Sequence, residues 1–504
     1  MTILKKPQVQ VLHNYIGGNW VDAEAQETQE VRNPATDEVL ALVPLGTKDD
    51  INQAVEAAAT AYPGWRATPP QERARYFFKL RQILELHRDE LARLITTEMG
   101  KTLDDARGEI QRGIENVETA CGIPTLMMGY SLEDGASHGI DEEVIYQPVG
   151  VFAGITPFNF PFMISFWFWP YAVASGNTFI LKPSEQDPLI QQRVFELIEQ
   201  VGFPKGVINM VNGGKEAVNA LLDHPKIKGI SFVGATKTAE YIYSRAAATG
   251  KRVQASGGAK NAIVVMPDAD LEMYLGTIMN SCFGAAGQRC LANSLILTVG
   301  SAHDAVRARV SEAASKLRLG NGLESGVDMG PVVSAAARDR INAAITQGVA
   351  EGAEAVLDGR NATVSEYPEG YFVGPTVLDG VLPGMSVYKE EIFGPVIGLM
   401  AVESLDEAIN LINTSEYGNA ASIFTQSGFA AREFRYRVET GNIGINVGVA
   451  APVSYFPFSG ARRSFFGNLH PQGRDAVRFF TESKVVITRW TPGDGEKTVT
   501  GIGR

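Results

Sequence analysis

The sequence predicts an α/β protein made of two closely joined domains. At 504 residues the chain exceeds what one compact core usually holds. From about residue 148, short apolar runs alternate with helix-like stretches, and a second series of this kind begins after residue 260. Near-continuous Val, Ile and Phe runs separated by helices are typical of a parallel sheet covered on both faces. No repeat or flexible linker separates the two series.

The N-terminal third is predicted to be helical after a short extended entry. Thr47 and Asp50 form a capping-box pattern before the helix-like stretch 51–62. The stretch 69–100 carries Phe and Leu at helical spacing and ends at Gly100. These apolar stripes indicate core packing and no chemistry.

Strands are predicted at the apolar runs of the first series, which are "GVFAGITPF", "NTFILKPS", "GVINMVNG", "IKGISFVG" and "NAIVVMPDA". Parallel sheets bind ligands at the carboxyl ends of their strands. The second series is predicted to have a helix at about 270–290, a strand at "SLILTVG", a helix at about 302–318, and further alternation through "ASIFTQ" and "GNIGINVG".

Composition excludes some classes of function. The chain is 45% hydrophobic and 20% charged, with a net charge of -12. Binding a nucleic-acid backbone requires clustered Lys and Arg, so we expect no nucleic-acid partner. The stretch 144–181 has no charged residue, but Pro157, Pro161 and Pro170 interrupt it. That pattern favours a buried core or pocket lining over a membrane span, and we expect no membrane partner.

The three cysteines, Cys121, Cys282 and Cys290, include no CxxC pair. We therefore predict neither a disulfide framework nor a metal site, and a reducing compartment. The first twenty residues lack an apolar run of signal-peptide length, so we expect a cytoplasmic protein.

Cys290 is the cysteine whose neighbours indicate reactivity. Arg289 precedes it, and Gly284 and Gly287 allow close approach of the backbone. None of the six histidines forms a local motif with Cys290, which weighs against a Cys-His hydrolase.

Three further stretches could bind a ligand. In "ITPFNFPF", Asn159 must satisfy its amide, either by bonding the backbone or by donating to an oxyanion. Lys182 and Glu185 follow an apolar strand, and Gly234 joins another strand to a helix. Neither junction is a G-x-G-x-x-G or Walker motif. A helix N-terminus can still hold a pyrophosphate, and a glutamate at a strand end can accept from ribose hydroxyls.

Together these motifs resemble the aldehyde dehydrogenase superfamily over nearly the whole chain. The segments "PFNFP", "KPSE", "FVGATKTAEYI", "GQRC" and "EEIFGPV" have its order and approximate spacing. The resemblance implies a Rossmann-type NAD-binding domain, an α/β catalytic domain and a small sheet that joins subunits into a dimer or tetramer. The implied ranges are 1–131 and 149–259 for NAD binding, 260–460 for catalysis, and 132–148 with 470–495 for oligomerisation.

The resemblance also implies roles for residues. Cys290 matches the nucleophile, and the Asn159 amide with the Cys290 N–H matches the oxyanion site. The matching cofactor-binding positions are Thr156, Pro157, Phe158, Lys182, Ser184, Glu185, Gly234, Glu391 and Phe393. Among them, Lys182 and Glu185 would hold the adenosine ribose, Gly234 the turn beneath the pyrophosphate, and Glu391 with Phe393 the nicotinamide ribose. A glutamate at 185 would repel a 2'-phosphate, which favours NAD over NADP.

One position departs from the superfamily pattern. Where hydrolytic members carry a glutamate base, this chain has Ser256, which cannot activate water by proton transfer at neutral pH. A thiol acceptor such as coenzyme A needs little base assistance, so the implied product is an acyl-CoA.

This combination resembles the methylmalonate-semialdehyde dehydrogenase branch, whose CoA-acylating enzymes act in valine breakdown. The stretches "EMGKTLDDARGEIQRGIENVE" and "VVMPDAD" are also similar to it, and Arg112 and Arg289 match its carboxylate-binding positions. Ser256 and Gly257 depart from the Asn and Met usual there. The implied reaction oxidises methylmalonate or malonate semialdehyde to propionyl-CoA or acetyl-CoA with loss of carbon dioxide.

Two other hypotheses stay open at this point. One is a hydrolytic semialdehyde dehydrogenase, for example one acting on succinate semialdehyde, with its base supplied from elsewhere in the fold. The other is a non-catalytic descendant that keeps the fold. Arg289 could also serve to lower the pKa of Cys290.

Overall fold

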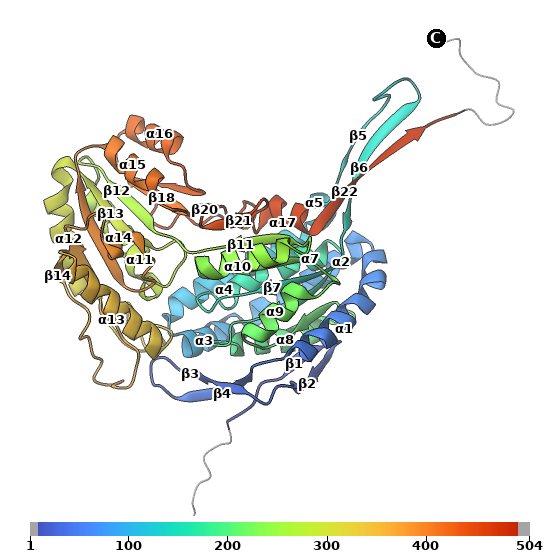
Figure 1. Cartoon of the computed structure of the whole chain (residues 1–504), viewed down its shortest axis with the longest axis horizontal. Helices are drawn as coiled ribbons and strands as arrows, with labels where there is room; N and C mark the ends of the chain where they lie inside the picture. The colour runs from blue at the N-terminus through green and yellow to red at the C-terminus, as the bar shows by residue number, and fades with distance from the viewer. Residues whose placement is uncertain (1–8, 492–504) are drawn as a thin grey trace, which may run out of the picture.

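The computed structural model describes residues 9–491 and has two α/β lobes, with a narrow arm of strands projecting from one of them (Figure 1). The ends of the predicted ranges 1–131 and 470–495, at 1–8 and 492–495, lie outside the described residues. The α/β class predicted from the sequence is confirmed.

The first lobe is built on an eight-stranded sheet. Its strands are β1 (Asn14–Ile16), β2 (Asn19–Val21), β7 (Val151–Ile155), β8 (Thr178–Lys182), β9 (Ile208–Met210), β10 (Ile227–Val233), β11 (Arg252–Ser256) and β21 (Phe465–Gly467). They lie in the order β2-β1-β9-β8-β7-β10-β11-β21, and the five from β9 to β11 are parallel. Since the chain runs from β7 to one side and from β10 to the other, their carboxyl ends border a crevice of the kind that binds dinucleotides.

Helices bury both faces of this sheet. They are α1 (Lys48–Ala67), α2 (Pro70–Leu86), α3 (Arg88–Met99), α4 (Leu103–Cys121), α7 (Trp169–Ala174), α8 (Leu189–Val201), α9 (Lys215–Asp223) and α10 (Thr236–Ala247). Along β8, Phe179 and Leu181 pack toward α2, α7 and α8, whereas Ile180 packs toward α1, α9 and α10. This two-sided burial is why the strands are apolar at every position.

The predicted capping box of α1 is confirmed, because Thr47 and Asp50 bond reciprocally at its first turn. The helical stretch 69–100, in contrast, is two helices. His87 separates α2 from α3, and its ring bonds the Glu90 carboxylate in the first turn of the new helix (2.6 Å).

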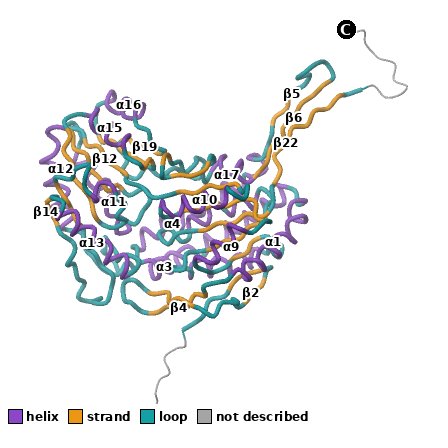
Figure 2. The backbone as a smooth tube through the Cα atoms, in the orientation of Figure 1, coloured by secondary structure: helices purple, strands orange, loops and turns teal. Residues whose placement is uncertain are grey.

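The second lobe holds a seven-stranded sheet. Its strands are β12 (Asn261–Val265), β13 (Asn293–Val299), β14 (Glu354–Leu357), β15 (Thr376–Asp379), β16 (Val396–Val402), β18 (Ala420–Phe424) and β19 (Asn442–Ile445). Its helices are α11 (Leu271–Phe283), α12 (His303–Ser315), α13 (Ala335–Ala350), α15 (Leu405–Thr414) and α16 (Gly428–Arg437). Figure 2 shows helices flanking both sheets.

Two sequence predictions for this lobe need correction. The run "NAIVVMPDA", grouped with the first series, forms β12 of the second sheet. The helix expected at about 270–290 ends at Phe283, because the chain turns there into a short 3-10 segment with left-handed residues.

The arm is a three-stranded sheet of β5 (Tyr130–Leu132), β6 (Ile140–Pro148) and β22 (Thr481–Arg489), in the order β22-β6-β5. Helix α17 (Gly473–Phe480), which lies inside the range 470–495, packs against α7 in the core of the first lobe. Its Phe479 and Phe480 rings contact Phe152, with centroids 5.8 and 4.9 Å away. Of the described part of the range 470–495, the strand β22 belongs to the arm and α17 belongs to the first lobe.

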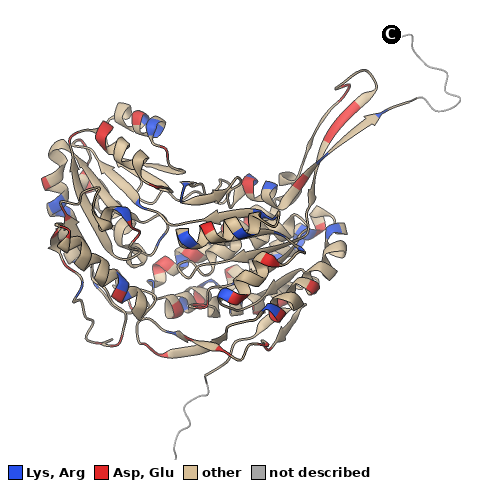
Figure 3. Cartoon of the chain, in the orientation of Figure 1, with Lys and Arg blue, Asp and Glu red and all other residues tan. Residues whose placement is uncertain are grey.

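Acidic and basic residues are interspersed on the helices that face the viewer in Figure 3. Within residues 9–491, no helix has the length and apolar character needed to cross a membrane. The uncharged stretch 144–181 instead supplies β7, α7 and β8, which are all buried.

Candidate active site

Cys290 lies on the loop between the 3-10 segment η1 (Gly284–Gly287) and β13, at the carboxyl edge of the first lobe's sheet. Its carbonyl oxygen accepts hydrogen bonds from the side-chain amides of Asn261 and Asn419, at 2.8 Å each. The backbone that carries the thiol is therefore fixed by the first residue of β12 and by the residue just before β18.

Gly287 allows this loop to press against a second functional segment. Its φ is 71°, and a Cβ added there would lie 2.1 Å from the carbonyl oxygen of Gly394. Gly394 follows Glu391 and Phe393 in the "EEIFGPV" stretch. The glycine of "GQRC" thus brings the two predicted segments together, and Cys290, Glu391 and Phe393 line one small cavity.

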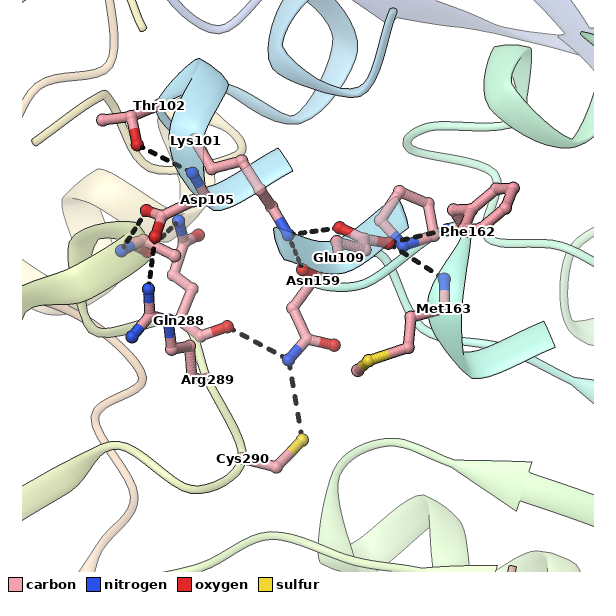
Figure 4. A network of polar contacts seen from close by, with 12 residues as sticks. Lys101, Thr102, Asp105, Glu109, Asn159, Phe162, Met163, Gln288, Arg289 and Cys290 are labelled. Atoms are coloured by element: carbon pink, nitrogen blue, oxygen red, sulfur yellow. Dashed lines mark hydrogen bonds and ion pairs between the residues drawn. The ribbon is translucent and has the colours of Figure 1, made fainter. Parts of the chain in front are cut away.

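Asn159 reaches the thiol from the loop after β7. Its Nδ2 lies 3.5 Å from the Cys290 Sγ and donates to the Gln288 carbonyl oxygen at 3.0 Å (Figure 4). When the thiol attacks an aldehyde carbon, negative charge develops on the aldehyde oxygen. The Asn159 amide points at the place that this oxygen would occupy. The sequence left two roles open for the Asn159 amide, bonding the backbone or donating to an oxyanion, and the geometry permits both at once.

A buried ion pair holds the main chain of Asn159. The Lys101 ammonium donates to the Asn159 carbonyl oxygen and to the Glu109 carboxylate, each at 2.6 Å. Glu109 also accepts from the backbone N–H groups of Phe162 and Met163, at 2.8 and 3.0 Å (Figure 4). Both charged side chains are fully buried, and each is satisfied by the other and by backbone groups.

The electrostatics of the thiol do not involve Arg289. Burial, with a further contribution from the Glu391 carboxylate, raises the pKa of Cys290 to about 11, and the Asn159 amide acts in the opposite direction. Within residues 9–491, Asn159 is the only side chain that hydrogen-bonds the Sγ. The pKa role considered for Arg289 therefore finds no support in the geometry.

Arg289 and Arg112 each face a protein carboxylate. The Arg289 Nη2 lies 2.5 Å from Asp105, and the Arg112 Nη1 lies 3.1 Å from Glu115. Both arginines and the Cys290 thiol line one cavity of about 540 Å³, which Phe160, Trp167 and Phe458 close on its apolar side. This cavity could hold a small carboxylated aldehyde with its aldehyde group near the thiol and its carboxylate near the guanidinium groups.

The predicted adenosine-ribose residues lie together at the carboxyl end of β8. Lys182 bonds the Glu185 carboxylate at 2.8 Å, and this ion pair lowers the pKa of Glu185 against the opposing effect of burial. Ser184 accepts from the backbone N–H of Gln186, at 3.1 Å. Glu185 is therefore an anionic acceptor beside the crevice of the sheet.

Thr156 and Gly234 occupy the crevice between β7 and β10. The Thr156 hydroxyl is buried and has no hydrogen-bond partner among the described residues. A Cβ at Gly234 would lie 2.4 Å from the Phe232 ring, so a larger residue at the entry to α10 would have to displace this buried ring. Ala235 begins α10 without a side-chain cap, which leaves the first N–H groups of the helix available to an anion.

Pro157 and Phe158 continue the same loop toward Asn159. The Phe158 ring meets the Phe393 ring edge-on, with centroids 5.8 Å apart. Glu391 accepts from the Ala259 N–H at 3.0 Å, and burial raises its pKa to about 7. Thus residues of both lobes that the sequence predicted to lie beside the nicotinamide meet next to the thiol.

Ser256 ends β11 and is buried, and its hydroxyl has no hydrogen-bond partner within residues 9–491. The next residue, Gly257, donates its N–H to the Ser464 carbonyl oxygen at 2.8 Å. The position expected to carry a base therefore offers a neutral hydroxyl.

Sequence reasoning missed Lys101, Asp105 and Glu109. They are spaced four residues apart, and Arg112 follows Glu109 by three, so these charges lie along one side of α4 and its N-terminal entry. The same pattern is equally typical of a solvated helix face. The sequence therefore did not distinguish charges that support a site from charges exposed to solvent.

Three comparisons bear on this site. The model of the aldehyde dehydrogenase family matches residues 20–486. A malonate-semialdehyde dehydrogenase of Geobacillus kaustophilus is 49% identical over 483 residues, which cover 96% of this chain and 99% of the relative. Another, from Halalkalibacterium halodurans, is 47% identical over 95% of this chain and 98% of its own.

Solved structures agree with these relatives. The methylmalonate-semialdehyde dehydrogenase of Oceanimonas doudoroffii superposes with a TM-score of 0.94 at 45% identity, covering 96% of this chain and 99% of that one. A protein from Sinorhizobium meliloti complexed with NAD gives a TM-score of 0.95 at 43% identity, covering 97% and 100%.

Proposed function

The chain belongs to the aldehyde dehydrogenase family, and from that premise we propose that it is an NAD-dependent, CoA-acylating dehydrogenase of malonate or methylmalonate semialdehyde. One observation carries the proposal. A single cavity holds the Cys290 thiol, Arg112 and Arg289, so it offers a nucleophile for an aldehyde and guanidinium groups for a carboxylate.

The covalent step begins at Cys290. After the thiol has lost its proton to solvent, the Cys290 thiolate forms a C–S bond with the aldehyde carbon, and the electron pair of the C=O bond moves to oxygen. The Asn159 amide and the Cys290 N–H stabilise that oxyanion. When the C=O bond re-forms, the carbon loses hydride and a thioester remains on Cys290.

The residues of the crevice fit NAD. The unpartnered Thr156 hydroxyl, the glycine entry to α10 and the uncapped helix N-terminus would hold the phosphates. Lys182 and Glu185 would hold the adenosine ribose, and the negative charge of Glu185 disfavours a 2'-phosphate. When bound, NAD supplies the acceptor for the hydride.

Release of the acyl group falls to coenzyme A, because Ser256 cannot act as the base for water. The CoA thiolate attacks the thioester carbon, the bond to Sγ breaks, and Cys290 leaves as a thiolate. The substrate's own carboxylate leaves as carbon dioxide when its C–C bond breaks, and the electron pair takes up a proton at the adjacent carbon. Malonate semialdehyde thereby gives acetyl-CoA, and methylmalonate semialdehyde gives propionyl-CoA.

We expect the enzyme to reduce NAD fastest with malonate or methylmalonate semialdehyde, and to sustain NADH formation beyond the first turnover only in the presence of coenzyme A. The assay follows NADH with these two aldehydes and with succinate semialdehyde, each with and without coenzyme A. Steady NADH formation from succinate semialdehyde without a thiol, yielding a free acid, would establish the hydrolytic alternative. Cys290→Ala is the control for non-enzymatic reduction.

The proposal includes a homo-oligomer, dimeric or tetrameric, joined through the arm. Tyr130, Leu132, Val485, Ile487 and Trp490 on the arm are each more than half exposed, and β22 is an edge strand. It also places the protein in the cytoplasm, where free thiols such as its three cysteines persist.

A further inference from the structure

The guanidinium of Arg289 is held in place before any substrate binds. Asp105 contacts its Nη2 at 2.5 Å, and the Asn280 side-chain oxygen accepts from its Nη1 at 2.8 Å. The Arg289 side chain is only 14% exposed and that of Asp105 only 20%, so water screens this pair weakly. Within residues 9–491 no hydrogen bond occupies the Nε–H, which leaves this donor available to a ligand.

The second oxygen of Asp105 holds the loop that leads to Cys290. Its Oδ2 accepts from the Ala285 N–H at 3.1 Å. Ala285 and Ala286 are in the left-handed region, with φ of 50° and 53°, a conformation that is costly for alanine. Asp105 therefore secures both the guanidinium and a strained part of the nucleophile's loop.

Asp105 is itself fixed to a rigid element. It lies in the first turn of α4, where its N–H donates to the hydroxyl of the N-cap residue Thr102 at 3.2 Å. Four residues along the same helix, Glu109 holds Lys101 and through it Asn159. One helix thus orients the carboxylate-binding side and the oxyanion side of the cavity (Figure 4).

We propose that Asp105 is a positioning residue that sets the preference for carboxylated aldehydes by fixing Arg289. The inference rests on the proposed function. Two effects of Asp105 oppose each other, since its charge repels a substrate carboxylate while its contact orders the guanidinium. Ordering dominates, because the charge is already paired, whereas a freed arginine would have to lose its rotamer freedom on binding.

The test compares Asp105→Asn with the wild-type enzyme. Asparagine can still accept from Ala285 but no longer pairs with Arg289. The matched control is Asp104→Asn, which removes the same charge from the same cavity rim. The Asp104 side chain is 92% exposed and bonds Arg107 instead.

The measured quantity is kcat/KM for malonate semialdehyde divided by kcat/KM for propanal, with NAD and coenzyme A present. We expect this ratio to fall about tenfold in Asp105→Asn, or about 1.4 kcal/mol. Asp104→Asn should leave it within about twofold. Asp105→Glu, which keeps a carboxylate, should recover part of the ratio.

An unchanged or increased ratio in Asp105→Asn overturns the inference while leaving the proposed function intact. Equal falls of the ratio in the Asp104 and Asp105 variants also overturn the inference. They would show that the loss of a negative charge, and not the loss of the contact with Arg289, changes the preference. A wild-type enzyme that does not prefer the carboxylated aldehyde overturns the proposed function and the inference together. Because the readout is a ratio within each variant, a general loss of folded enzyme cancels.

Discussion

At the scale of single residues, Cys290 is a neutral thiol in the ligand-free protein. Burial and the Glu391 carboxylate raise its pKa to about 11, above the usual 8.5 or so for a cysteine. Glu391 is itself perturbed to a pKa of about 7, so its charge develops within the neutral range. The nucleophile must therefore be activated by what binds next to it.

We expect the alkylation rate of Cys290 in the ligand-free enzyme to rise throughout the range from pH 6 to pH 9. A group whose pKa is raised stays protonated at neutral pH, and its thiolate fraction increases about tenfold per pH unit below that pKa. Inactivation by iodoacetamide, followed as loss of aldehyde-dependent NADH formation, measures this rate. A plateau below pH 8 would show a preformed thiolate and contradict the account. Cys121→Ser with Cys282→Ser removes the other thiols as a control.

The sequence motifs predicted site residues but not the side chains that hold them. Cys290, Asn159 and the two arginines were identified from motifs. The structure brings Cys290 and both arginines to one cavity and places the Asn159 amide 3.5 Å from the thiol. Asp105 lies 184 residues from Arg289, so no local pattern could link them. Because this partner was not visible in the sequence, Arg289 could also be interpreted as a residue that lowers the pKa of the neighbouring thiol.

At the scale of elements, α4 and its N-terminal entry order the site through the Lys101–Glu109 pair. Breaking a buried pair leaves one uncompensated charge, which costs far more than the pair contributes when intact. Because Lys101 also bonds the Asn159 main chain, its loss should affect the chemical step as well as stability.

Lys101→Met should lower the free energy of unfolding by about 3–5 kcal/mol, and it should lower kcat. Adding Glu109→Gln removes the stranded charge and should restore part of the stability but not kcat. Urea unfolding and steady-state kinetics provide the two readouts. Lys79→Met is the matched control, since Lys79 also donates to a carbonyl oxygen but is exposed. A stability loss no larger than that control's would contradict the proposed importance of the pair.

Element types followed from the sequence better than element ends did. The apolar runs of the parallel strands were recognised because burial on both faces makes them continuous. The break between two helices at His87 was not predicted, because the apolar spacing continues across it from α2 into α3. Strand β11 was missed because its sequence, "RVQAS", is short and half polar, and its place is fixed by pairing with β10 and β21.

At the scale of the whole molecule, one face of the arm carries a row of largely exposed apolar side chains within residues 9–491. Val485 pairs with Val144, which pairs with Tyr130, so these three side chains lie side by side across the sheet. In the next row on the same face, Ile487 and Leu132 flank Glu142. A subunit interface would bury this face and pair the free edge of β22.

Val485→Lys together with Ile487→Lys should reduce the proposed oligomer to smaller units, because two charges would have to be buried at its interface. Light scattering coupled to size-exclusion chromatography measures the mass. Leu86→Lys, at an exposed position on α2, is the control. An unchanged mass in the arm variant would exclude this face as the interface.

The central claim is that acyl transfer to a thiol, and not to water, completes the reaction. It rests on Ser256 in place of a carboxylate base and on the reactive geometry around Cys290. A rapid-mixing experiment with malonate semialdehyde and NAD tests it most directly. Without coenzyme A, we predict a burst of about one NADH per subunit, an acylated Cys290 in the mass spectrum, and turnover only after coenzyme A is added. Continued turnover without coenzyme A, with free acid as the product, would contradict the claim.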